Sequence, residues 1–163
     1  MSKRLNLREF QQKLIDRLQA TDLAARVTTL GVQIAGRNWI VDMMDISEVL
    51  PLPAPTAVPF TKPWYRGVSN VRGKLYSVVD MAAYEYSEAA SGVANNRVLL
   101  VGERFAFNAA LLVDRVLGSR DTQAWQQSEV DGQTVYLDEQ GAPWRKLDVH
   151  SLLGQAEFLQ IGV

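Results

Sequence analysis

The sequence predicts a mainly β protein, built as two similar small barrels that follow one N-terminal helix. Three observations lead to this fold class. After residue 26, short runs rich in β-branched and aromatic residues alternate with glycine-containing turns. The pattern of the first half returns in the second half at a nearly constant distance. Before both halves, the first segment carries an apolar stripe with helical spacing.

Residues 1–26 are expected to form a helical extension. Asn6 followed by Glu9 fits a capping box, in which each side chain bonds a free amide group of the first turn. Four large apolar residues then recur at helical spacing: Leu7, Phe10, Leu14 and Leu18. Such a stripe packs on the rest of the domain or, alternatively, binds a partner. We expect the first, with the second as the alternative.

Two hairpins and a short helix are predicted in the first half. The first hairpin joins residues 29–35 to 38–43 through Gly36-Arg37, and the second joins residues 66–71 to 74–79 through Arg72-Gly73. Asp80 is then expected to cap a helix over residues 81–86.

A short polar stretch, residues 45–48, follows the first hairpin. Residues 51–63 then hold five of the six prolines of the chain. Because proline lacks the amide donor, this segment cannot be a central strand or a helix. We expect an extended loop that crosses the domain.

The second half repeats this plan. Predicted strands cover residues 97–101 and 105–112, with Asp114-Arg115-Val116 at the end, and then residues 133–137 and 144–147. Asp148 is expected to cap a short helix that Gly154 closes.

The distances between equivalent residues define the repeat. Gly36 precedes Gly102 by 66 residues, Gly73 precedes Gly141 by 68, and Asp80 precedes Asp148 by 68. Closure into barrels is how short antiparallel strands avoid open edges, so two barrels are predicted over about 27–80 and 97–148, with exchange of strands between them allowed. Residues 156–163 are expected to be a C-terminal tail.

The composition excludes several functions. The 163 residues contain no cysteine and one histidine, and the formal net charge is −1. Thiol chemistry and cysteine-bound metals are therefore excluded, and no cofactor, metal or nucleic-acid partner is expected. The charged N-terminus is unlike a signal peptide, and no apolar run is long enough to cross a membrane, so we expect a cytoplasmic protein without membrane insertion.

Few residues suit catalysis. The densest carboxylate cluster, Asp42, Asp45 and Glu48, is explained by a solvated strand end, and His150 by a short C-terminal helix. The chain has no phosphate-binding glycine loop, nucleophile elbow or metal-ligand spacing, so an enzyme is not expected.

A different class of function is an oligonucleotide-binding barrel, which would stack bases on exposed aromatic residues beside basic ones. Trp39, Tyr65 and Phe105 are the candidates for that role. In a slightly acidic chain, these residues are better interpreted as core or as a protein-binding surface. A non-catalytic interaction module is therefore the default interpretation.

One motif resembles the signature of a known protein family. Residues 67–73, GVSNVRG, followed by Asp80, resemble the signature of CheW-like chemotaxis coupling proteins, G-x-x-N-x-R-G followed by a strand and an aspartate. The segment LLVDRVLG, residues 111–118, is similar to another strand of that family. The resemblance covers about residues 27–155. The motif N-x-R-G alone would indicate only a hairpin turn, whereas this combination in this order is specific.

The resemblance implies two intertwined five-stranded SH3-like barrels and a non-catalytic adaptor. Such proteins couple the cytoplasmic tips of methyl-accepting chemoreceptors to the regulatory domain of a CheA-type histidine kinase, in membrane-associated receptor arrays. The residues that the motif implies for protein binding, at a corner between the barrels, are Gly67, Asn70, Val71, Arg72 and Gly73. Arg72 is the main candidate, because its planar guanidinium can bond a carboxylate or several carbonyls at once.

The chain departs from the family pattern in two places. Ser77 stands where the family usually has proline, and the N-terminal extension is longer than in minimal flagellar coupling proteins. The extension resembles the type IV pilus branch (PilI-type), which acts in twitching motility, and a flagellar coupling protein is the alternative. Arg120, in a charged segment outside the motif, is expected to be dispensable for binding.

Overall fold

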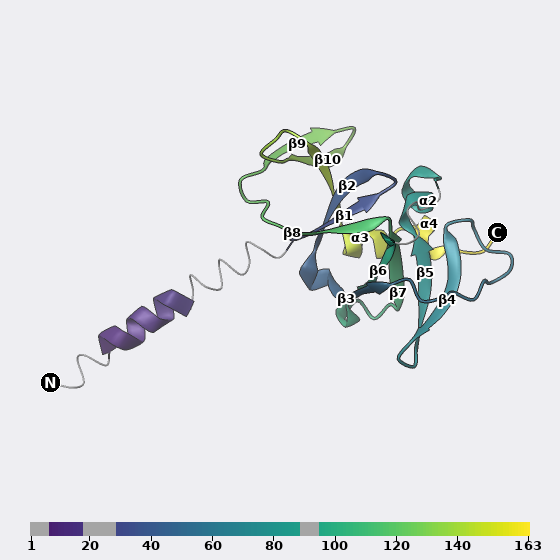
Figure 1. Cartoon of the computed structure of the whole chain (residues 1–163), viewed down its shortest axis with the longest axis horizontal. Coiled ribbons are helices and arrows are strands. Elements are labelled where there is room, and N and C mark those ends of the chain that lie inside the picture. Colours follow the sequence, from purple (N-terminus) through teal and green to yellow (C-terminus); the bar gives the residue numbers. More distant parts are fainter. Residues whose placement is uncertain (1–6, 18–28, 89–94) are drawn as a thin grey trace.

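The computed structural model describes residues 7–17, 29–88 and 95–163, and it is mainly β (Figure 1). The first half of the chain forms the elements β1 (Thr29–Ile34), β2 (Arg37–Asp42), η1 (Met43–Asp45), β3 (Ile46–Pro51), β4 (Tyr65–Val71), β5 (Lys74–Asp80) and α2 (Met81–Tyr86). The second half forms β6 (Arg97–Val101), η3 (Glu103–Phe105), β7 (Ala109–Val113), β8 (Arg115–Arg120), β9 (Gln126–Val130), β10 (Gln133–Leu137), β11 (Pro143–Leu147), α3 (Val149–Leu153) and α4 (Ala156–Leu159).

The strands form two sheets, and each sheet takes strands from both halves of the chain. One has the order β8-β1-β2-β11-β10-β9 and the other β3-β6-β7-β5-β4. Strand β2 pairs in parallel with β11, and β7 pairs in parallel with β5. These two contacts occupy equivalent places in the repeat, so the halves exchange their first hairpins. The intertwined arrangement is confirmed, but neither 27–80 nor 97–148 corresponds to one sheet.

Three strands were not predicted, and all three lie at the edges of the sheets. They are β3, β8 and β9. Strand β9 is exposed along its whole length, and β3 ends in Pro51, so the apolar alternation that reveals a half-buried strand is weak in both. With β9 added, the first sheet has six strands where five were expected.

The predicted strand over 105–112 begins later, at Ala109. The 3-10 turn η3 occupies residues 103–105, and Ala106 has a positive φ of 51°. A left-handed residue interrupts a strand, so the apolar residues of this segment pair only after the turn.

Both predicted helix caps are confirmed. The Asp80 carboxylate accepts a hydrogen bond from the Ala83 amide at 3.2 Å, and Asp148 accepts one from Ser151 at 3.1 Å. Helix α3 ends at Gly154 as predicted, although Gly154 keeps a right-handed conformation. The repeat therefore extends to the same cap in each half.

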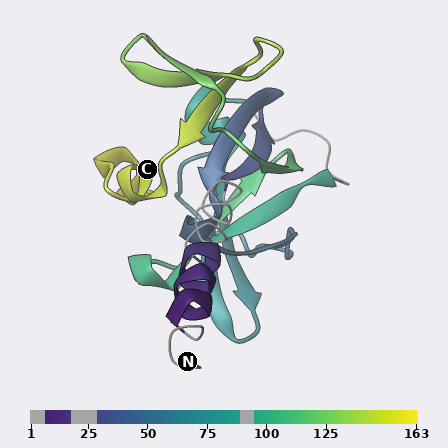
Figure 2. The same ribbon diagram turned by 90° about the vertical axis from the view of Figure 1, so that its left-hand side faces the viewer.

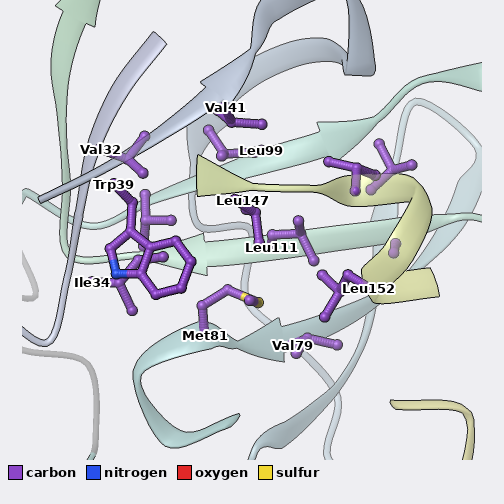
Figure 3. Packing of buried hydrophobic residues seen from close by; sticks show 14 of the residues in the cluster. Val32, Ile34, Trp39, Val41, Val79, Met81, Leu99, Leu111, Leu147 and Leu152 are labelled. Carbon is purple, nitrogen blue, oxygen red and sulfur yellow. The ribbon is translucent and has the colours of Figure 1, made fainter. Parts of the chain in front are cut away.

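The main core lies between the two sheets (Figure 3). Side chains from both halves meet there, including Val41 and Leu147 from the first sheet and Val79, Leu99 and Leu111 from the second. A smaller cluster fills the inside of the five-stranded sheet with Tyr76, Val78, Val98, Leu100, Ala110 and Leu112. Alternate residues of β6 thus face different clusters, which fixes the strand register.

The predicted N-terminal helix is confirmed over residues 7–17 (Figure 2). Its expected packing on the domain is wrong for the described part, since Leu7, Phe10 and Leu14 are 59%, 63% and 47% exposed. Leu18 lies outside the described residues. Among the residues that the structure describes, no helix is both long and apolar enough to span a membrane.

Residues 156–163, expected to be a tail, pack on the domain instead. Phe158 of α4 is buried and stacks on Trp64 with ring centroids 5.9 Å apart. The amide of Lys62 donates to Ile161, and the amide of Val163 donates to Phe60, at 2.8 and 3.0 Å. A buried aromatic residue in this segment is the reason why it belongs to the folded domain.

Candidate functional site

The five residues implied by the motif all lie on the β4–β5 hairpin. Its turn consists of Arg72 and Gly73, as predicted, with Val71 paired to Lys74. Both turn residues have positive φ angles, 50° and 85°. This combination fits a type I′ turn, whose twist matches that of the strands that it joins. Arginine at such a position costs backbone energy, which the pairing of the two strands compensates.

Asn70 and Val71 shape this turn. The Asn70 side-chain oxygen accepts a hydrogen bond from the Gly73 amide at 2.9 Å, which closes the turn from outside. Val71 is half-buried and packs against the apolar cluster inside the five-stranded sheet. These two contacts fix the direction in which the hairpin tip presents Arg72.

The Arg72 side chain is exposed and forms an ion pair with Glu48 of β3. The hydrogen bond from Arg72 lowers the pKa of Glu48 and raises that of Arg72. A second pair lies beside it, Lys74 Nζ to Glu103 Oε1 at 3.0 Å, and there too the hydrogen bond raises the pKa of the lysine. Exposed ion pairs of this kind contribute little to stability. The four side chains form an exposed, charged surface, which we call the hairpin-tip surface.

The hairpin tip lies at the end of the five-stranded sheet that points away from the six-stranded sheet, as both views show (Figures 1 and 2). The family resemblance implies that Asn70, Arg72 and Gly73 lie at a corner between the barrels. The hairpin tip does not lie at a corner between the two sheets. These residues lie against β3 and η3 instead, because Arg72 contacts Glu48 and Lys74 contacts Glu103.

Gly67 has a structural role at the other end of β4. Its φ is 119°, and a side chain there would collide with the carbonyl oxygen of Thr56. Thr56 and Val68 form two backbone hydrogen bonds, of 2.8 and 3.0 Å, so the proline-rich segment lies directly on β4. Only glycine permits this close approach of two backbones. Gly67 thus positions the hairpin without being part of the hairpin-tip surface.

The carboxylate cluster near the end of β2 is accounted for by ion pairs. Asp42 lies 3.5 Å from Lys146, and Asp45 and Glu48 pair with Arg104 and Arg72. Each carboxylate has its own cation, which does not suit a hydrolytic pair with separated pKa values. Within 7–17, 29–88 and 95–163, no group of three or more acidic or histidine side chains is placed to hold a metal ion.

The aromatic residues considered for base stacking do not form an exposed platform. Trp39 and Tyr65 are buried, and Phe105 packs partly against the main core. A stacking platform needs exposed ring faces, so the oligonucleotide interpretation loses its candidate residues. His150 lies exposed on α3, as expected of a residue without a special role.

Sequence reasoning missed Glu48, Lys74 and Glu103 as members of this surface. The sequence groups Glu48 with Asp42 and Asp45 in a carboxylate cluster, because it does not predict β3 or the ion pair between Glu48 and Arg72. The sequence ISEVLP alternates only weakly between apolar and polar residues, so it holds no clear signal that places Glu48 beside the hairpin tip.

The structure thus shows a mainly β domain of two sheets with an exposed, charged hairpin tip. A family model described as CheW-like domain matches residues 28–157. The chain belongs to the CheW-like family, whose members are scaffold and coupling proteins without catalytic activity.

Two relatives support this assignment. The chain is 31% identical over 144 residues to Protein PilI of Pseudomonas aeruginosa, covering 82% of this chain and 79% of that protein. The fold is similar to that of the scaffolding protein TtCheW from Thermoanaerobacter tengcongensis, with a TM-score of 0.65 and 18% identity over 80% of this chain and 94% of the other. The SH3-like, mainly β fold class and the PilI-type branch are thereby confirmed.

Proposed function

We propose that this protein is a non-catalytic adaptor that couples the cytoplasmic tip of a chemoreceptor to the regulatory domain of a CheA-type histidine kinase. The observation that carries the proposal is the exposed Arg72 on a hairpin whose turn is fixed by Asn70 and Val71. A side chain that contributes little to folding, yet is held in a defined direction, suits docking. The protein would act in the cytoplasm, recruited to membrane-associated receptor arrays.

The pathway that we propose is the control of twitching motility by type IV pili. Similarity to Protein PilI over most of the chain supports the pilus branch over the flagellar alternative. The N-terminal helix, with its exposed apolar stripe, is in line with the longer extension noted in the sequence.

Substitution of Arg72 tests the proposal. Arg72→Ala is expected to weaken binding to the kinase regulatory domain and to the receptor tip by roughly ten- to a hundredfold, since it removes a charge-assisted contact. Arg72→Glu should weaken binding further if the partner group is acidic, and Arg72→Lys should restore part of the affinity, because lysine lacks the planar fork. Calorimetry against each purified partner measures the change.

The control needs an exposed arginine without such a role. Arg120, expected to be dispensable, is unsuitable because it lies over the Trp144 ring at 5.4 Å and donates to the Leu117 carbonyl at 3.1 Å. Arg115 is exposed at the start of β8 and is the better control. Arg115→Ala should leave both affinities unchanged. If Arg72→Glu binds both partners as tightly as the wild type, the proposed docking role is wrong.

A further inference from the structure

A cleft of about 390 Å³ is lined by residues of the short helices α2 and α3 and of the strands β10 and β11. It shares no residue with the hairpin-tip surface. Its volume is within the range of small-molecule sites in proteins. Buried side chains of the main core form its floor, namely Trp39, Leu147 and Leu152 (Figure 3). Because a close-packed core is rigid, the cleft exists before a ligand binds.

Two oppositely charged side chains line the cleft from different halves of the chain. Glu85 lies on α2 and Arg145 on β11, and both residues are half-buried. In the part of the chain that the structure describes, neither side chain forms an ion pair or a hydrogen bond. The other charged residues of the lining are occupied, since Lys146 pairs with Asp42 at 3.5 Å and Asp148 caps α3. Glu85 and Arg145 are thus the charges that the cleft offers to a ligand.

The electrostatic surroundings of Glu85 favour a bound cation. Burial is the main cause of the raised pKa of this carboxyl, while Arg145 lowers that pKa and Glu157 raises it. Arg145 is therefore near enough to interact with Glu85 through space, although the two groups do not form an ion pair. A half-buried carboxylate without a partner is unfavourable, and an ammonium group beside it would relieve this cost. The space between the two charges suits a molecule that carries both signs.

The rest of the lining is rich in groups that both donate and accept hydrogen bonds. Hydroxyls come from Thr134, Tyr136 and Ser151, and amides come from Gln133 and Gln155. Hydroxyl and amide groups match a ligand side chain that also donates and accepts, such as a carboxamide. An apolar ligand would bury these groups without partners, which is costly. The lining therefore favours a small polar molecule over an apolar one.

We propose that this cleft binds a free α-amino acid with a polar side chain, with its ammonium group on Glu85 and its carboxylate on Arg145. An α-amino acid carries both charges on one carbon atom, and the planar guanidinium of arginine binds a carboxylate through two parallel hydrogen bonds. Glu85 belongs to the helix that follows the five-stranded sheet and Arg145 to the six-stranded sheet, so the ligand would connect elements of both. This binding goes beyond the receptor–kinase coupling proposed above and does not use the hairpin-tip surface.

Titration of the full chain with L-glutamine, followed by nuclear magnetic resonance, tests the proposal. Amide signals of residues 132–136 and 145–152 should shift and saturate, with a Kd on the order of 1 mM or tighter, because two charge-assisted contacts form. N-acetyl-L-glutamine lacks the ammonium group and L-glutaminamide lacks the carboxylate, so each should bind at least tenfold more weakly. No saturable shift at these residues, or an equal affinity for N-acetyl-L-glutamine, would overturn the proposal.

Neutral variants of the two charged residues test the assigned contacts. Glu85→Gln and Arg145→Gln should each weaken L-glutamine binding at least tenfold. Glu85→Gln removes a half-buried charge and keeps the shape of the side chain, so its thermal midpoint should not fall. This variant should bind N-acetyl-L-glutamine as the wild type does, because that molecule has no ammonium group for Glu85. His150→Gln, on α3 but outside the lining, should bind L-glutamine like the wild type. Wild-type affinity of Glu85→Gln for L-glutamine would refute the proposal.

Discussion

The β4–β5 and β10–β11 hairpins are two versions of one structure, and they differ in where their polar groups point. The repeat distance of 68 residues makes Asn70, Gly73 and Tyr76 of the first equivalent to Asp138, Gly141 and Trp144 of the second. Both aromatic residues are buried, and both glycines have positive φ. The shared residues are those that the hairpin needs to fold.

The polar residue at the start of each turn shows the difference. Asn70 accepts one hydrogen bond, whereas Asp138 accepts three, from the Gln140 and Ala142 amides and from the Trp144 indole at 2.9, 2.8 and 3.0 Å. The indole bond is the main cause of the lowered pKa of Asp138. In the second hairpin, the polar groups stabilise the fold. In the first hairpin, Arg72 points outward and contributes little to the stability of the fold. For this reason we propose that binding occurs there.

The strands below the turns differ as well. Val135 is buried on β10, and the equivalent position of β4 is Gly67, which the proline-rich segment covers. The proline-rich segment thus covers β4 of the first hairpin. Gly67 is required there because the backbone of this segment comes so close to the strand.

The largest expected effect is that of Gly67→Ala. Strain at a φ of 119° and collision with the Thr56 backbone should together cost about 2–5 kcal/mol of unfolding free energy, measured by urea denaturation. Gly36→Ala is the matched control, because Gly36 also has a positive φ but a Cβ there meets no atom within 4 Å. It should cost about 1 kcal/mol. Equal losses of unfolding free energy in both variants would mean that the close approach to Thr56 does not contribute to the destabilisation.

The hairpins, both caps and the duplication could be predicted because each has a signal in the sequence: a glycine in the turn, an aspartate before a helix, a constant spacing. The exchange of strands has no such local signal and was implied only by the family resemblance, since the parallel contacts β2–β11 and β5–β7 join residues far apart in the chain. The candidate site was found through a motif, but Glu48, its partner, lies on an edge strand with a weak pattern. Local propensity does not report which distant charges a folded sheet brings together.

The next largest effect on stability is expected from replacing the two helix caps, Asp80 and Asp148. Asp80 is buried and also lies 3.4 Å from Arg66, whereas Asp148 is exposed and caps only α3. Asp80→Ala should therefore cost about 2 kcal/mol and Asp148→Ala about 1 kcal/mol. Urea denaturation of both variants measures this difference. A larger loss for Asp148→Ala would contradict the view that the first half buries its cap more deeply.

A smaller effect, dependent on pH, is expected at Asp138. Its pKa is lowered in the folded protein, so its contribution to stability is present above the ordinary aspartate value of about 4 and is lost as the pH falls through the folded-state pKa. Asp138→Asn should lower Tm by a few degrees at pH 7 and by less as the pH falls below about 4. Thermal scans from pH 3 to 7 measure this trend. A deficit in Tm that stays constant over this range would show that the lost charge is not the cause.

The smallest effect on stability is expected from changes in the N-terminal helix. Like Arg72 on the first hairpin, its apolar side chains do not stabilise the folded domain. Leu7, Phe10 and Leu14 are exposed, so their replacement by serine removes no buried apolar area. The triple variant should keep the wild-type Tm within about one degree. It should nevertheless weaken formation of the complex with the kinase regulatory domain or the receptor tip, because large apolar side chains on one stripe remain exposed only at a cost that a partner can relieve. Replacing Gln11 and Gln12 by serine, on the same helix, should change neither quantity. A fall in Tm in the triple variant would show that the stripe packs on the domain after all, and unchanged Tm and binding together would show that the helix has no role in either.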